Sequence, residues 1–229
     1  MNYAILLAGG TGQRIHSEIP KQYVRVGDKM MVTYALETLL RSPRVDTVCV
    51  VADPSWRDEI RQDVDGLVDA GKLRGFADPG ENRQCSIWNA LKKIQEYGDG
   101  DTVLIHDAAR PFLTMELLES CYQALSGHDG VMPVLPMKDT VYRSRDGRKV
   151  AELIDRSEIF AGQAPELFML RPYAEAVRSL IPDRILKVNG SSEPAVMVGM
   201  DIAMIPGDER NVKVTTDADL ERFRKGLGS

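Results

Sequence analysis

The sequence predicts an α/β fold: a mostly parallel β-sheet covered by helices on both faces, with a protruding β-hairpin arm. Short apolar runs without alternation recur along the chain, as expected of strands that are buried on both faces. Segments with apolar residues at helical spacing separate these runs, as expected of crossover helices. Two strand-like pieces around Asp146-Gly147 predict the hairpin, because Asp-Gly is a strong turn signal.

The first strand is expected at Tyr3–Ala8, an apolar run that is too short for a helix and is followed by Gly9-Gly10. Further strands are expected at 46–52, 101–106, 130–135 and 202–205, and helices at 30–40, 54–70, 83–97, 115–125, 172–180 and 217–225. The hairpin breaks this alternation, so we expect a single domain over 1–229 with an arm at about 139–156.

Composition limits the possible functions. The 229 residues are 43% hydrophobic and 28% charged, as in a globular protein with a sizeable core. The formal net charge of -5 argues against a general nucleic-acid binder, which needs a basic surface. A net-acidic chain can still build a local cationic pocket for a phosphate ligand.

Cysteine and histidine usage points to a reducing compartment and away from a caged transition metal. Cys49, Cys85 and Cys121 lie far apart without a CxxC pair, and the three histidines show no ligand spacing. The chain starts directly with a strand-like run, and no apolar stretch approaches the roughly 20 residues that span a bilayer. We therefore expect a cytoplasmic protein with no membrane partner.

The strongest local signal is Leu7-Ala-Gly-Gly-Thr-Gly-Gln-Arg14, followed by Pro20-Lys-Gln22. Glycines directly after a buried strand let backbone N–H groups approach phosphate oxygens, and Arg14 and Lys21 add positive charge. The pattern is neither a Walker A motif nor the dinucleotide GxGxxG, because position 15 is Ile. A simple tight turn is the alternative, but the two cations favour a triphosphate site.

A second signal, His106-Asp-Ala-Ala-Arg-Pro111, stands at the end of a predicted strand. Ligands of open α/β sheets collect at that edge, and a carboxylate there can hold Mg²⁺ against a triphosphate. In the alternative interpretation, Asp107 caps the next helix and pairs with Arg110. We interpret His106 as a structural, hydrogen-bonded group, Trp88 as a core residue and Cys85 as inert. Asp208-Glu209-Arg210 is interpreted as a solvated turn.

Six motifs occur in order along almost the whole chain: LAGGTGQR, PKQY, Gly80-Glu-Asn-Arg83 with Ser86, HDAARP, Asp139-Thr140, and Asn211-Val-Lys-Val-Thr215. Together they resemble the cytidylyltransferase family that activates sugar-alcohol phosphates, over roughly residues 3 to 223. This resemblance implies a Rossmann-like nucleotidyltransferase fold and a homodimer in which the arm crosses to the partner. It also implies transfer of CMP from CTP to a polyol phosphate, with Mg²⁺ and release of pyrophosphate.

The resemblance also assigns roles to residues. Arg14 and Lys21 match the catalytic residues that stabilise charge on the α-phosphate, and Asp107 matches the metal ligand. The nucleotide-binding positions are Ala8, Gly9, Gly10, Gly12, Gly80, Glu81, Ser86 and Ala108. The polyol phosphate would be held by Arg110, Thr140, Arg156 and Lys213, with Thr140 and Arg156 supplied by the arm. Arg156 and Lys213 also count as catalytic in this assignment.

Three departures from the family pattern leave the acceptor open. The common Gln-Thr-Pro-Gln is Gln163-Ala-Pro-Glu166 here, Thr-Asp-Glu or Thr-Asp-Ala is replaced by Asn189-Gly-Ser191, and an acidic residue before Asn-x-Lys-x-Thr is Arg210. The leading acceptor is 2-C-methyl-D-erythritol 4-phosphate, and the nearest alternative is ribitol 5-phosphate or another pentitol phosphate. A sugar-1-phosphate or molybdopterin nucleotidyltransferase is a more distant alternative. A regulatory nucleotide-binding module is disfavoured because Arg14 and Lys21 are both present.

Overall fold

A computed structural model describes residues 1–10, 19–67, 69–94 and 96–226. Its main strands are β1 (Asn2–Leu7), β4 (Thr47–Val51), β5 (Leu73–Ala77), β6 (Thr102–Asp107), β7 (Gly130–Pro136), β10 (Phe160–Gly162), β11 (Glu166–Met169) and β12 (Ile202–Pro206). They form one sheet in the order β10-β7-β11-β6-β1-β4-β5, and β12 pairs with β7.

The sheet is mixed, with a parallel core, as the sequence predicts. β1 is parallel to both β4 and β6, β4 is parallel to β5, and β12 is parallel to β7. β11 lies antiparallel between β6 and β7, and β10 is antiparallel to β7. β5, β10 and β11 are not among the strands expected from the sequence, and their pairing with distant strands defines them.

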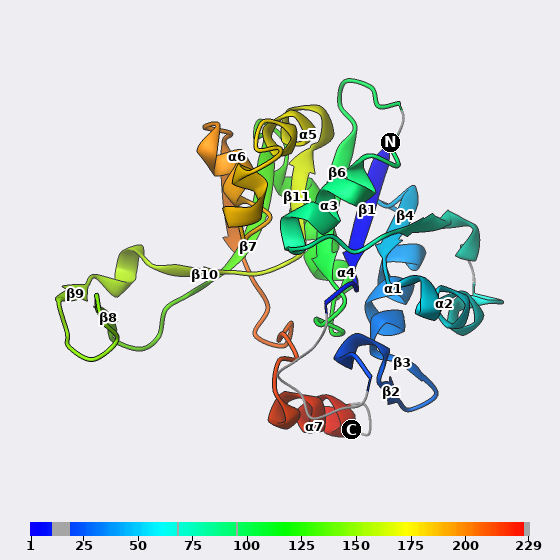
Figure 1. Ribbon diagram of the computed structural model, residues 1–229, viewed down its shortest axis with the longest axis horizontal. Helices are drawn as coiled ribbons and strands as arrows, with labels where there is room; N and C mark the ends of the chain where they lie inside the picture. The colour runs from blue at the N-terminus through cyan, green and yellow to red at the C-terminus, as the bar shows by residue number, and fades with distance from the viewer. Residues whose placement is uncertain (11–18, 68, 95, 227–229) are drawn as a thin grey trace.

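Helices cover both faces of the sheet (Figure 1), which confirms the predicted layers. Ala4 and Leu6 of β1 face one core with α1, α2 and α4, whereas Ile5 faces the other core with α3, α5 and α6. The bounds are α1 Met31–Arg41, α2 Arg57–Val64, α3 Arg83–Leu91, α4 Met115–Ala124, α5 Leu170–Arg178, α6 Glu193–Met197 and α7 Asp217–Gly226. No helix in the described part of the chain is long and apolar enough to span a membrane.

Two predicted helices are too long. The one expected at 54–70 is a 3₁₀ turn, Pro54–Trp56, followed by α2, which ends at Val64. Gly66 follows with a φ of 81°, a left-handed conformation that does not continue a right-handed helix. The helix expected at 83–97 ends at Leu91, where Lys93 N–H turns back to the carbonyl of Ala90.

Besides the two cores, a third hydrophobic cluster lies beyond the carboxyl ends of the parallel strands. α7 lies there beside the short hairpin of β2 (Arg25–Val26) and β3 (Lys29–Met30) (Figure 1). Leu220 and Phe223 of α7 pack with Val24, Val26, Met31 and Val214. This packing fixes the C-terminal segment next to the loops that follow β1 and β6.

The predicted arm is present. β8 (Val141–Arg143) and β9 (Glu152–Ile154) pair antiparallel, with Val141 opposite Ile154. Gly147 in the connecting turn has a φ of 70°, which favours glycine, and Asp146 accepts the N–H groups of Arg148 and Lys149. Figure 1 shows the arm projecting from the sheet between β7 and β10.

Candidate active site

A pocket of about 570 Å³ opens at the carboxyl edge of the parallel strands. Leu7 ends β1 and Asp107 ends β6, and the two are partners in the register of these strands. The pocket is lined by Leu7, Gly9, Gly10, Lys21, Gln22, Gly80, Glu81, Asn82, Arg83, Ser86, Asp107, Ala109 and Lys213. Eight predicted site residues, from five separate motifs, therefore meet in one place: Gly9, Gly10, Lys21, Gly80, Glu81, Ser86, Asp107 and Lys213.

The first part of the glycine-rich loop is packed against its neighbours. Ala8, buried below the pocket, donates its N–H to the carbonyl of Val51 over 2.8 Å. A Cβ at Gly9 would lie 2.8 Å from the Cβ of Pro79, so a larger residue would push the two loops apart. Gly12 and Arg14 lie outside the described residues, and their roles stay predictions.

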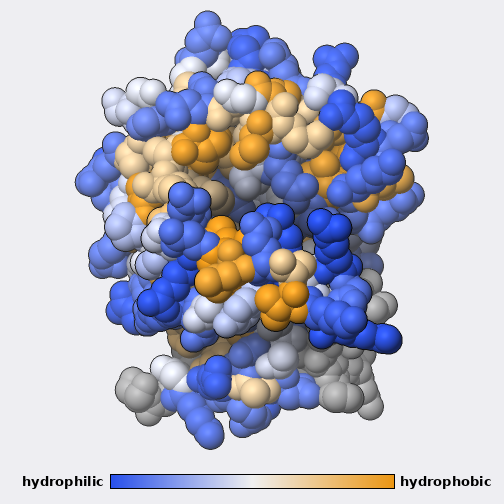
Figure 2. Space-filling model, turned by 90° about the vertical axis from the view of Figure 1, so that its left-hand side faces the viewer, coloured by the Kyte–Doolittle hydropathy of each residue, from blue (hydrophilic) through white to orange (hydrophobic). Residues whose placement is uncertain are grey.

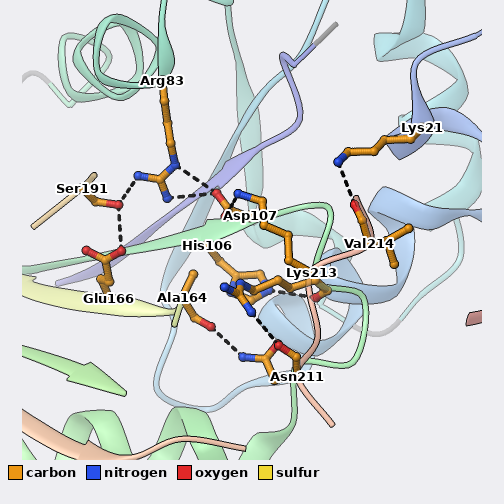
Figure 3. A network of polar contacts seen from close by, with 11 residues as sticks. Lys21, Arg83, His106, Asp107, Ala164, Glu166, Ser191, Asn211, Lys213 and Val214 are labelled. Carbon is orange, nitrogen blue, oxygen red and sulfur yellow. Dashed lines mark hydrogen bonds and ion pairs between the residues drawn. The ribbon is translucent and has the colours of Figure 1, made fainter. Parts of the chain in front are cut away.

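Lys21 reaches the pocket from a single 3₁₀ turn, Lys21–Tyr23. Its ammonium donates to the backbone carbonyl of Val214 over 2.7 Å (Figure 3). Val214 follows Lys213, so this contact joins the N-terminal motif to the C-terminal motif across the pocket. The two lysines thus approach the same space from opposite ends of the chain.

Asp107 is held between two cations (Figure 3). Arg83 donates to its Oδ1 from Nε over 3.1 Å and from Nη2 over 2.9 Å, and Lys213 Nζ donates to Oδ2 over 2.9 Å. The alternative role of Asp107, a helix cap paired with Arg110, is wrong. Thr114 caps α4 by accepting the N–H of Leu117, and Asp107 pairs with Arg83 and Lys213.

These cations keep Asp107 ionised. Burial alone would raise the pKa of its carboxyl, but the attraction of Arg83 and then of Lys213 holds that pKa well below its usual range. Among the described lining residues, Lys21, Arg83 and Lys213 outnumber Glu81 and Asp107, so the pocket is locally cationic in a chain of net charge -5. Such a pocket suits an anionic ligand.

A second carboxylate lies behind Arg83. Arg83 Nη1 also donates to Ser191 Oγ, and Ser191 donates to Glu166 Oε1 over 3.1 Å. Glu166 is buried, and burial raises the pKa of its carboxyl while the charge of Arg83 opposes the rise. Two of the departures from the family pattern are therefore in direct contact with each other.

Arg110 is tied to the C-terminal segment. It donates from Nη1 to the carbonyl of Asn211 over 2.7 Å, and Asn211 Nδ2 donates to the carbonyl of Ala164 over 2.6 Å. His106 is fully buried, its Nε2 is 3.0 Å from the carbonyl of Arg110, and burial lowers its pKa to about 4. His106 is therefore neutral and structural, as predicted.

The segment after β5 closes the pocket. Asn82 caps α3 by accepting the N–H of Cys85, and Ser86 Oγ accepts the N–H of Gly80 over 2.9 Å. A Cβ on Gly80 would collide with Cys85, so this turn requires glycine. Ala108 is fully buried and donates its N–H to Leu7, and it is its neighbour Ala109 that lines the pocket.

Thr140 and Arg156 are not brought to this pocket within one chain. Both are exposed on the arm, and Arg156 donates to the carbonyl of Lys138 over 2.5 Å. Trp88 packs on the second core, as predicted. Asp208 is bound by Arg210 in the predicted turn.

Sequence reasoning missed Gln22, Asn82 and Arg83 as site residues, although all three stand inside the quoted motifs. Their position gave a signal. Gln22 directly follows the predicted catalytic lysine, and Asn82 and Arg83 start a helix at the strand edge where ligands collect.

Glycines, lysines and an ionised aspartate at the carboxyl edge of a parallel sheet are the arrangement of a nucleotide-binding transferase. Comparison with known proteins makes this specific. The family model "IspD: 2-C-methyl-D-erythritol 4-phosphate cytidylyltransferase" matches residues 2–225, and the chain belongs to this family of CTP-dependent nucleotidyltransferases.

Three individual relatives illustrate this membership. The chain is 31% identical to a 2-C-methyl-D-erythritol 4-phosphate cytidylyltransferase of Lachnospira eligens, covering 96% of both chains. It is 29% identical to a ribitol-5-phosphate cytidylyltransferase of Streptococcus pneumoniae, again covering 96% of both. It is 34% identical to a bifunctional IspD/IspF enzyme of Maricaulis maris over 99% of this chain but only 57% of the relative, so the chain spans about half the length of that enzyme.

Solved structures support the fold. A crystal structure of 4-diphosphocytidyl-2C-methyl-D-erythritol synthase superposes with a TM-score of 0.80 at 26% identity, covering 99% of this chain and 98% of that one. The corresponding synthase from Anaerococcus prevotii gives a TM-score of 0.84 at 24% identity, covering 100% and 96%. The expected nucleotidyltransferase fold is confirmed.

Proposed function

We propose that this protein transfers CMP from CTP to a sugar-alcohol phosphate and releases pyrophosphate, with 2-C-methyl-D-erythritol 4-phosphate as the acceptor. The observation that carries the proposal is the meeting of Lys21, Asp107 and Lys213 with Gly9 and Gly10 in one cationic pocket. The family match over residues 2–225 supports the same reaction. We place the reaction in the cytoplasm, where free thiols such as those of this chain stay reduced.

In the proposed reaction, a phosphate oxygen of the acceptor attacks the α-phosphorus of CTP in line. The bond from the α-phosphorus to the bridging oxygen breaks, and pyrophosphate leaves. The attacking phosphate is already anionic, so the protein mainly positions the reactants and stabilises charge. Lys21 and Arg14 would act on the α-phosphate, and Lys213 and Arg110 on the acceptor.

Mg²⁺ fits this site. No cluster of three or more His, Cys, Asp or Glu in the described part of the chain could cage a metal. Mg²⁺ commonly needs only one or two carboxylates, since substrate phosphates and water complete its shell. Asp107 lines the pocket, and its neighbouring cations keep it ionised. Bound there, Mg²⁺ would neutralise charge on the triphosphate.

The nucleotide is proposed to be CTP because the family reads the base through backbone groups near Gly80, Glu81, Ser86 and Ala108. A pocket with acceptors for an exocyclic amine leaves polar groups unpaired against uracil. Pyrophosphate release should therefore be much faster with CTP than with UTP. Equal rates would contradict this base assignment.

A panel of polyol phosphates assayed with CTP tests the acceptor. We expect pyrophosphate release with 2-C-methyl-D-erythritol 4-phosphate. Ribitol 5-phosphate is the second candidate, favoured by the relative of that name and by Ala164, which lacks the family's threonine hydroxyl. If only ribitol 5-phosphate supports pyrophosphate release, ribitol 5-phosphate becomes the proposed acceptor in place of 2-C-methyl-D-erythritol 4-phosphate. Inactivity with every polyol phosphate would reject the proposal.

We also propose a homodimer in which Thr140 and Arg156 of each arm complete the partner's pocket. Exposed apolar side chains gather on the side from which the arm projects (Figure 2), and they include Val150, Leu153, Phe160, Val196, Met197, Val198 and Met204. Exposed apolar groups of this kind are typical of interfaces. Their burial between two chains would bring each arm to a neighbouring pocket.

Subunit mixing tests this division of the site. Arg156→Ala and Lys21→Ala homodimers should each be nearly inactive. A mixed dimer would carry both lesions in one site and leave the other whole, so activity should partly return after exchange. Verified exchange without recovery would contradict a shared site, as would a fully active monomer.

A further inference from the structure

Gln22 bridges two carbonyl groups of the glycine-rich loop. It is the middle residue of the 3₁₀ turn Lys21–Tyr23, only 3% exposed, and lines the pocket. Its Nε2 donates to the carbonyl oxygens of Ala8 over 2.7 Å and of Gly10 over 2.6 Å. A side-chain amide nitrogen carries two hydrogens, so these bonds use both donors.

Tyr23 strengthens the same arrangement. Its hydroxyl donates to the carbonyl oxygen of Ala8 over 2.7 Å and accepts the N–H of Asp53 over 3.3 Å. The ring is 1% exposed and stacks on Trp56 with the centroids 4.7 Å apart. The oxygen of Ala8 therefore receives two donors from one rigid turn, which occupies both of its lone pairs.

Fixing a carbonyl also fixes the N–H of its peptide unit. The unit is planar and trans, so its N–H points away from its oxygen. Carbonyl oxygens directed at a triphosphate would repel it, whereas N–H groups attract it. We propose that Gln22 is a positioning residue for the phosphate-binding loop: its amide holds the oxygens of Ala8 and Gly10 away from the nucleotide, and the N–H of Gly9, on the opposite side of the Ala8 peptide unit, is left to the phosphates.

This inference rests on the proposed function, because it assigns the loop to the triphosphate of CTP. It also explains why a glutamine follows the lysine. A carboxylate would only accept and could not hold two carbonyls, and a methionine has the length but no N–H. Neighbouring residues of one turn thus have separate tasks: Lys21 supplies charge, and Gln22 orients the backbone.

The test compares Gln22→Met and Gln22→Glu with the wild type and with Gln123→Met. Gln123 is on α4 and donates to Glu119 on the surface, so the control makes the same chemical change far from the loop. Binding of CTP with Mg²⁺ is measured by calorimetry, together with KM for each substrate and the melting temperature without ligand. Gln22→Met should weaken CTP binding at least about tenfold, in line with the loss of two buried hydrogen bonds.

KM for the acceptor should stay within about twofold, and Gln22→Glu should bind CTP more weakly still because it adds negative charge. A purely structural role would lower the melting temperature but leave the CTP affinity of the folded protein unchanged. Wild-type affinity in folded Gln22→Met overturns the inference, whereas a wild type that does not bind CTP overturns the proposed function instead. If Gln22→Met does not fold, Tyr23→Phe serves in its place, with about threefold weaker CTP binding expected and unchanged binding overturning the inference.

Discussion

Replacement of Asp107 by asparagine separates the stabilising role of this residue from its proposed metal-binding role. The variant keeps the shape of the side chain but removes the charge that Arg83 and Lys213 share. Asp107 accepts three charge-assisted hydrogen bonds, between 2.9 and 3.1 Å long. Asparagine has only one acceptor oxygen, so it can accept from Arg83 or from Lys213 but not from both, and its NH2 group then faces the other cation.

The magnitude follows from burial. The side chain of Asp107 is 12% exposed, Arg83 24% and Lys213 38%. Removing one partner of a buried ion pair costs about 3–5 kcal/mol, and the partly exposed lysine contributes little of this. We expect a loss of about 2–4 kcal/mol in the free energy of unfolding. For a chain of this size each kcal/mol lowers the melting temperature by about 2–4 °C, so the shift should lie between roughly 4 and 16 °C.

The assay has two parts. Urea unfolding gives the loss of stability, and pyrophosphate release against Mg²⁺ concentration gives the loss of function in the variant that remains folded. We expect a kcat at least about 10²-fold lower at saturating Mg²⁺, since one preorganised charge is worth about that much in a transition state. Unchanged stability would refute the ion-pair argument. An unchanged response to Mg²⁺ would refute the assignment of Asp107 as metal ligand.

Three other predictions concern single side chains. Lys21→Ala should lower kcat about 10²-fold or more in a folded protein, and near-normal kcat would reject its role at the α-phosphate. Glu166→Gln should change how the free energy of unfolding depends on pH. Burial raises the pKa of Glu166, so the wild type should lose stability relative to the variant as pH rises above about 4.5. Parallel curves of unfolding free energy against pH, measured by urea unfolding, would contradict this. Asp219 and Thr216 exchange hydrogen bonds at the start of α7, so Asp219→Asn should cost about 1 kcal/mol above pH 4. That difference should vanish as pH falls through the lowered pKa of Asp219, about 2, and a constant difference would argue against the carboxylate as the cap.

The parallel core could be predicted from the sequence because each of its central strands has a recognisable local pattern. β1, β4 and β6 are apolar runs buried on both faces, and nothing distant is needed to interpret them. β5 and β11 were missed for the opposite reason. β5 contains an arginine and a glycine, and β11 has only four residues, so each is a strand because of the neighbours with which it pairs.

The site likewise has parts that a local pattern predicts and parts that depend on distant residues. Glycines and a lysine after a buried strand predict phosphate binding locally, but the distance between that strand and Lys213 along the chain hides their proximity. The ion pair of Lys213 with Asp107 depends on α7, whose apolar side packs on the β2–β3 hairpin. Gln22 follows the predicted catalytic lysine, but its partners are backbone carbonyls, so no other side chain in the sequence indicates the contact.

Two of the three departures from the family pattern act on one network, not on separate contacts. Family members commonly have an amide at the position of Glu166 and a carboxylate in the stretch where this chain has Asn189-Gly-Ser191. Here the carboxylate is at 166, and Ser191 links it to Arg83 and so to Asp107. The carboxylate of Glu166 therefore lies one hydrogen bond beyond Ser191, and Arg83 pairs with Asp107 through its other nitrogens. Because this chain of contacts ends at Asp107, which lines the pocket together with Arg83, the residues at 166 and 191 affect how firmly Asp107 is held.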